Sequence, residues 1–140
     1  MTDEQSTDEE TTEEQSFSKV FLLARLVFGG VLAFTAIDNL RDLENNIAYA
    51  ENNDAPQPEL TVPFGSGALL VGSIGIALWR VPRLAALSVL TFLVPTTPIM
   101  HDFWAVDEDQ KEMQQIQFLK NLGLIGGALA FLVIGGRETE

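Results

Sequence analysis

Four long apolar runs alternate with polar segments along the chain. They cover residues 17–37, 62–79, 84–100 and 116–135. A helix of about 20 residues crosses the hydrocarbon core of a bilayer. The second and third runs are slightly shorter, which prolines and local thinning of the bilayer accommodate. The pattern therefore predicts four membrane-spanning helices.

A soluble four-helix bundle is the alternative interpretation. Its helices would carry polar residues along one side, with a period of about 3.6 residues. The chain has no charged residue from Val62 to Trp79 or from Leu84 to Met100, so these helices lack a side that faces water. We therefore expect an all-α fold, a four-transmembrane-helix bundle in contact with lipid, as a multi-pass protein of the plasma membrane.

Acidic charge is concentrated at the N-terminus. The formal net charge is −12, and the opening segment MTDEQSTDEETTEE contains seven acids and no base. Because this segment has no large apolar residue to bury after Met1, we expect residues 1–15 to be a disordered acidic tail that precedes a membrane domain over residues 16–137. The acid excess is of a halophilic type. No basic face is available for phosphates, so we expect no nucleic-acid partner.

Lysine and arginine near the ends of the spans indicate the orientation of the bundle. In a four-span protein, both termini and the loop between the second and third spans share one side of the membrane. That side has four basic residues and the opposite side has two: Lys19, Arg80, Arg83 and Arg137 against Arg41 and Lys111. Because cytoplasmic segments carry the excess of basic residues, we expect both termini in the cytoplasm.

Small residues recur at helical spacing within the spans. Gly65, Gly72 and Gly75 share one face of the second span. Gly123 and Gly127 form a GxxxG pair in the fourth. Membrane helices approach one another closely at such positions, so we expect these glycines to serve helix packing. The same faces suit contacts between two copies of the chain, and a homo-oligomer is left open.

Two cations lie within the predicted spans. On a helical wheel, Arg25 lies near Gly29 and Lys120 lies near Gly127, so both point toward the small-residue side of their helices. A charged group inside a membrane is by default a functional candidate with a partner. The alternative is that each side chain extends along its helix to the nearer interface. Both interpretations stay open.

The segment PTTPIMHDFW, residues 95–104, contains the only histidine of the chain. Two prolines interrupt the third span near its outer end, which places the polar residues that follow at the outer rim. Trp104 then lies at headgroup depth, where indole is favoured. The first span ends and the fourth begins on the same side. The predicted polar site therefore consists of Asp38, His101, Asp102, Lys120 and Asn121.

The chemistry of this site follows from its residue types. His101 beside Asp102 suits proton transfer near neutral pH, and at a lipid interface such a pair suits protonation of a quinone. A single histidine excludes haem ligation through two imidazoles, and no helical H-x-x-x-H or E-x-x-H spacing predicts a metal site. The absence of cysteine excludes thiolate and iron–sulfur chemistry. The alternative role is structural, with His101, Asp102 and Trp104 capping the interrupted helix.

The order of several segments resembles the DoxX family of small four-helix membrane proteins, over about residues 17–136. These segments are ARLVFGGVLAF, DNLRDLE, PELTVPFGSGALLVG, WRVPRLAA, MHDFW and QFLKNLGLIGGAL. The resemblance implies a four-helix bundle in the plasma membrane and an association with quinone-linked oxidoreduction. The positions that match the recurring pattern of the family are Arg25, His101, Asp102, Trp104, Phe118, Lys120 and Asn121.

Three functions follow as hypotheses. The first is an accessory or small subunit in quinone-linked electron transfer, with quinone as substrate, no resident cofactor, and electrons supplied by another membrane or soluble redox subunit. There His101 and Asp102 relay protons and Lys120 contacts a quinone oxygen or another anion. The second is a non-enzymatic scaffold or partner of a soluble enzyme, and the third is a small-solute carrier. Whether the chain has enzymatic activity is left open.

Overall fold

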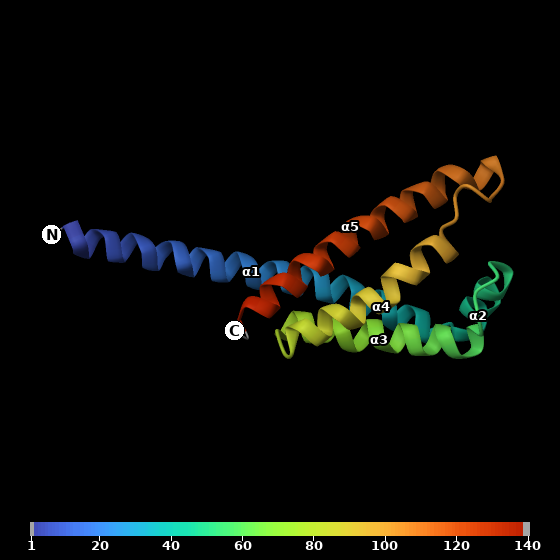
Figure 1. The fold of residues 1–140 in the computed structure, drawn as a ribbon, viewed down its shortest axis with the longest axis horizontal. Coiled ribbons are helices and arrows are strands. Elements are labelled where there is room, and N and C mark those ends of the chain that lie inside the picture. The colour runs from blue at the N-terminus through green and yellow to red at the C-terminus, as the bar shows by residue number, and fades with distance from the viewer. Residues whose placement is uncertain (1, 139–140) are drawn as a thin grey trace.

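The computed structural model describes residues 2–138, which form helices joined by short connections (Figure 1). Four of the five helices are long and apolar enough to cross a membrane, which confirms the prediction of an all-α fold with four spans. The fifth, α2, lies in a segment that the apolar pattern leaves as a polar loop. The helices are α1 (Thr2–Arg41), α2 (Leu43–Asn52), α3 (Pro58–Leu78), α4 (Pro82–Met100) and α5 (Glu108–Glu138).

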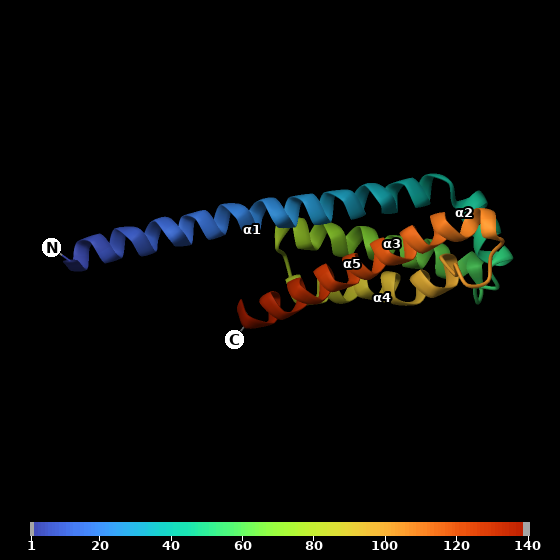
Figure 2. The same cartoon turned by 90° about the horizontal axis from the view of Figure 1, so that it is seen from above.

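The four long helices pack in chain order. Helix α1 lies against α3, α3 against α4, and α4 against α5, while α2 packs beside α3 (Figure 2). Helices α1 and α5 meet through large side chains: the ring centroids of Phe28 and Phe131 are 5.1 Å apart. Buried apolar residues of all four helices form one core, which includes Leu32, Leu69, Val89 and Ala128.

The bundle has two chemically different ends. One end carries α2 and the connection over residues 101–107, and we call it the α2 end (Figure 1). The other carries the tight turn between α3 and α4 and the end of α5, and we call it the terminal end. The N-terminal half of α1 extends far past the terminal end (Figure 2).

The two shorter candidate spans, α3 and α4, match the thickness of a membrane. Helix α3 has 21 residues and α4 has 19, so at 1.5 Å per residue they are about 31 and 28 Å long, close to a hydrocarbon core of about 30 Å. Each has proline in its first turn, where no backbone donor is needed. Helix α3 ends at Trp79, whose indole lies beside Arg25 of α1. The ring of Phe21 on α1 also contacts this indole. Residues 2–20 of α1 therefore extend roughly 28 Å beyond the level at which α3 ends.

The prediction of a disordered acidic tail is wrong, because residues 2–15 continue α1 as helix. The segment has no glycine or proline, and glutamate and glutamine are good helix formers. Its acids lie toward the positive end of the helix dipole. Since the membrane span already supplies a nucleus, each added residue only elongates an existing helix. Met1, the first residue of the predicted tail, lies outside the described residues.

Candidate functional site

A chain of hydrogen bonds joins three helices at the α2 end. His101, the residue that ends α4, has its Nδ1 atom 2.9 Å from Oε1 of Gln114 on α5. Gln114 Nε2 donates to the Tyr49 hydroxyl of α2 at 3.1 Å, and that hydroxyl donates to the carbonyl oxygen of Met100 at 3.0 Å. Because an amide oxygen only accepts, His101 Nδ1 carries the proton of this bond. In the neutral ring, Nε2 is then the atom that accepts a proton.

Asp102 follows directly and has an unusual environment. Its Oδ1 atom is buried and has no hydrogen-bond partner, one of two such buried side-chain atoms in the described part of the chain. His101 and Asp102 are thus not hydrogen-bonded to each other through this Oδ1 atom. His101 is hydrogen-bonded to Gln114 instead. A buried acceptor without a donor is destabilising by about 1–3 kcal/mol, more when it is charged. Asp102 Oδ1 is therefore a buried acceptor that the described residues leave without a donor.

Three aromatic rings lie beside these polar groups. Phe103, Trp104 and Phe118 contact one another edge to face, with ring centroids 5.2, 5.4 and 5.8 Å apart. Such ring contacts stabilise the fold by more than the apolar area that they bury, and they hold the connection over residues 101–107 against α5. Trp104 is still 58% exposed, as expected for an indole at a membrane interface.

The other predicted residues of this end are more dispersed. Asn121 is only 7% exposed and continues the packed face of α5. Lys120 is exposed, and its Nζ donates to Oε1 of Gln117 at 2.7 Å. Asp38 is exposed near the end of α1. Within residues 4–137 no ion pair joins Asp38 to Lys120, so the structure brings His101, Asp102 and Trp104 together and leaves these two charges at the surface.

Arg25 lies at the opposite end of the bundle. It precedes Asp38 by 13 residues on one continuous helix, a separation of about 20 Å along the axis. The centre of its guanidinium lies 5.2 Å from the ring centroid of Phe21 and 5.6 Å from that of Trp79. Its environment is therefore aromatic, and it belongs to no common site with His101.

Sequence reasoning missed Tyr49 and Gln114, which complete the hydrogen-bonded chain. They lie 52 and 13 residues from His101 along the sequence, in a segment interpreted as loop and at the start of the last helix. A usable signal exists for Tyr49: it is the only tyrosine of the chain, and it lies in a connection on the same side as the only histidine. Gln114 is one of several glutamines in its segment and carries no comparable signal.

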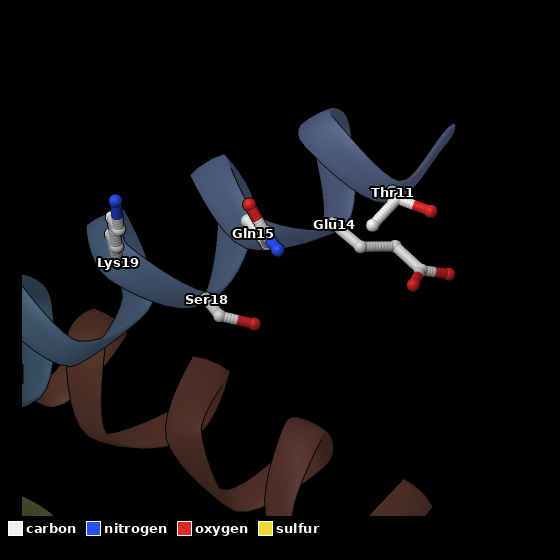
Figure 3. A pocket seen from close by; sticks show the side chains of 5 residues that line it. All are labelled: Thr11, Glu14, Gln15, Ser18 and Lys19. Carbon is white, nitrogen blue, oxygen red and sulfur yellow. The ribbon is translucent and has the colours of Figure 1, made fainter. Parts of the chain in front are cut away.

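Two surface hollows lie away from this site. Both lie along the N-terminal half of α1, one of them lined by Thr11, Glu14, Gln15, Ser18 and Lys19 (Figure 3). Their lining residues all come from one helix, so no second wall encloses a ligand, and we assign them no role. Among the described residues, no group of three histidine, cysteine, aspartate or glutamate side chains is placed to hold a metal ion.

The fold and its apolar helices define a multi-pass α-helical membrane protein. The chain belongs to the DoxX family, whose family model matches residues 20–102, more than half of its length. The matched range includes Arg25, Asp38, His101 and Asp102, and ends before the rest of the predicted site: Trp104, Phe118, Lys120 and Asn121. No curated protein and no solved structure matches the chain.

Proposed function

We propose that this chain is an accessory membrane subunit in quinone-linked oxidoreduction and that its α2 end binds the quinone head group. The observation that carries the proposal is the buried, unpartnered Oδ1 of Asp102 beside the hydrogen-bonded chain of His101. A quinol hydroxyl is a donor of the kind that this oxygen lacks. The exposed indole of Trp104 offers an aromatic face to the ring at the depth where a lipid-soluble quinone presents its head group.

The role of the chain in this reaction is binding and proton transfer. Quinone and quinol differ by two electrons and two protons. The electrons are exchanged with a redox centre of a partner subunit. The protons are exchanged with Asp102 Oδ1 and with Nε2 of His101, whose Nδ1 is engaged by Gln114. Lys120, with an exposed ammonium on α5 at the same end, is the candidate contact for the second quinone oxygen.

A second candidate function is a non-enzymatic scaffold for a soluble enzyme. The observation that favours it is the extension of α1 past the terminal end, which carries an acidic helix beyond the rest of the bundle (Figure 2). In that case the polar groups of the α2 end are structural. The hydrogen bond from Tyr49 to the Met100 carbonyl is then a cap for the last turn of α4.

Quinone binding separates the two functions. We would measure equilibrium binding of a short-chain quinol analogue, kept reduced, to detergent-purified protein, with Asp102→Asn, His101→Ala and Lys120→Met as variants. Asp107→Asn is the matched control, because Asp107 is an exposed aspartate of the same connection. We expect saturable binding that weakens about tenfold or more in the Asp102 and His101 variants and is unchanged in the control. Absent binding, or equal binding by every variant, would favour the scaffold.

We also propose that both termini lie in the cytoplasm. Because the sequence has no cysteine, single cysteines report the side of the membrane without background. We expect Gln5→Cys to be protected in intact cells from a membrane-impermeant maleimide and Ala105→Cys to be labelled. The reverse pattern would invert the orientation of the bundle.

A further inference from the structure

Most cations of the chain gather at the terminal end, opposite the proposed quinone site. Five of the eight lysines and arginines lie on the elements that meet there: Lys19, Arg25, Arg80, Arg83 and Arg137. Within residues 4–137, none of these five forms an ion pair with a carboxylate. The terminal end of the bundle therefore carries five cations that are not ion-paired within the described residues.

Arg25 is the most constrained of these cations. Its side chain is half-buried, and its guanidinium lies against the rings of Phe21 and Trp79. Those two rings meet edge to face at 4.8 Å, and Phe131 lies 6.0 Å from each of them. The Nε atom of Arg25 is buried and has no acceptor. Aromatic faces attract a cation but accept none of its hydrogen bonds in the way that an oxygen does.

The depth of Arg25 is that of lipid headgroups. It lies beside Trp79, the residue that ends α3, and α3 is about as long as the hydrocarbon core is thick. The turn that follows is tight, because Trp79 and Val81 both have positive φ angles, 55° and 45°. Backbone strain of this kind persists only where the surrounding structure imposes it. The turn holds the indole against Arg25 while the next residue, Arg80, is exposed.

We propose that Arg25 binds the phosphate of an anionic phospholipid at the terminal end of the bundle, with Arg80 as a second contact. A guanidinium presents a planar fork of donors that matches two phosphate oxygens. Since Nε is buried, the Nη groups are the donors that a ligand reaches. The acyl chains would lie along exposed apolar side chains that follow Arg25 on the same helix, among them Leu26 and Val31. This adjoining apolar surface is the reason for a lipid rather than free phosphate.

The ligand and the site are independent of the proposed quinone function. The two sites lie at opposite ends of the bundle, so either proposal can be wrong while the other holds. The measurement is native mass spectrometry of the full chain released from detergent, titrated with phosphatidylglycerol or with phosphatidylcholine of the same acyl chains. The variants are Arg25→Gln and Arg25→Lys. Arg41→Gln is the matched control, because Arg41 is an exposed arginine at the other end of the same helix.

We expect one retained phosphatidylglycerol at low lipid concentration and no comparable retention of phosphatidylcholine. Arg25→Gln should weaken retention about tenfold to a hundredfold, and Arg25→Lys should weaken it less, because the charge stays and the fork is lost. The Arg41 variant should bind as the wild type does. Circular dichroism of each variant in the same detergent identifies any that fails to fold, and Arg80→Gln then serves as the second test, with a smaller expected loss.

Three results would overturn the proposal. The first is equal retention of the two lipids, and the second is an equal effect of the Arg25 and Arg41 substitutions. The third is competition by inorganic phosphate at concentrations similar to those of the lipid, which would make the site one for a soluble anion. High salt should weaken lipid retention only in part, because a partly buried charge is screened less than an exposed one.

Discussion

The two glycine-bearing faces of the bundle look alike in sequence and differ completely in packing. A Cβ atom placed on Gly72 of α3 would lie 2.6 Å from the carbonyl oxygen of Ala85 on α4. A Cβ atom on Gly123 of α5 would meet no atom within 4 Å. The packing role predicted for Gly72 is thus confirmed, and for Gly123 it is not seen within the chain. Glycine spacing indicates that close approach is allowed, and the neighbouring helices decide whether it occurs.

The difference follows from the order of the helices. Helix α3 lies between α1 and α4, so both of its sides approach a neighbour closely. Helix α5 has α4 as its close neighbour and leans away from α1 toward the α2 end (Figure 1). It reaches α1 through Phe28, whose ring lies 2.9 Å from the Cβ position of Gly127. The bundle therefore has a packed side at α3 and an open side between α1 and α5.

The largest effect that we expect is on the packed side. Gly72→Ala puts a methyl group against the backbone of α4, which a side-chain rotation does not relieve, so the free energy of unfolding should fall by about 3 kcal/mol. Thermal or denaturant unfolding of the purified protein in detergent measures it. Gly30→Ala is the control, since a Cβ atom at Gly30 meets nothing within 4 Å. An equal change of stability in both variants would mean that the contact with α4 does not set the result.

The next effect concerns the polar contacts that hold α5 at the α2 end. Tyr49→Phe removes the hydroxyl that links α2 to Gln114 and to the Met100 carbonyl. We expect a loss of about 1–2 kcal/mol, because two hydrogen bonds disappear and partners stay behind. Unfolding of Tyr49→Phe, Gln114→Leu and the double variant forms a cycle, and a coupling energy of about 1 kcal/mol is expected. Strict additivity would show that the hydrogen-bonded chain does not act as a unit.

On the open side, the change in stability caused by a glycine-to-alanine substitution should have the opposite sign. Gly123→Ala adds a methyl group in open space and improves helix propensity, so we expect stability to rise by about 0.5–1 kcal/mol. The same unfolding measurement is used. A loss of stability, accompanied by a smaller particle in light scattering, would show that a second copy of the chain packs on this face.

Part of the fold and of the site can be predicted from the sequence. The four spans follow from apolar runs, because a bilayer requires about 20 apolar residues for each helix. His101 and Asp102 lie at one rim because α4, which runs as one helix through Pro95 and Pro98, ends at Met100. The apolar run 17–37 does not reveal that Arg25 lies beside Trp79, the residue that follows α3. The contact of Tyr49 with Met100 joins residues 51 apart, and no local pattern encodes it.

The smallest effect on the bundle concerns the part of α1 that contacts nothing else. Glu10→Pro interrupts the projecting helix at an exposed position, one turn or more from either end of the acidic segment. The helical signal in circular dichroism should fall, while the unfolding transition of the bundle shifts by less than about 0.5 kcal/mol, because no packed contact is lost. Glu10→Gln, which keeps helix propensity, should change neither.

An unchanged helical signal in the proline variant would mean that the acidic segment is not helical in solution. A large shift of the unfolding transition would mean that it packs against the bundle. The expected result leaves an acidic helix that stands free of the bundle, on the same side as the cations of the terminal end.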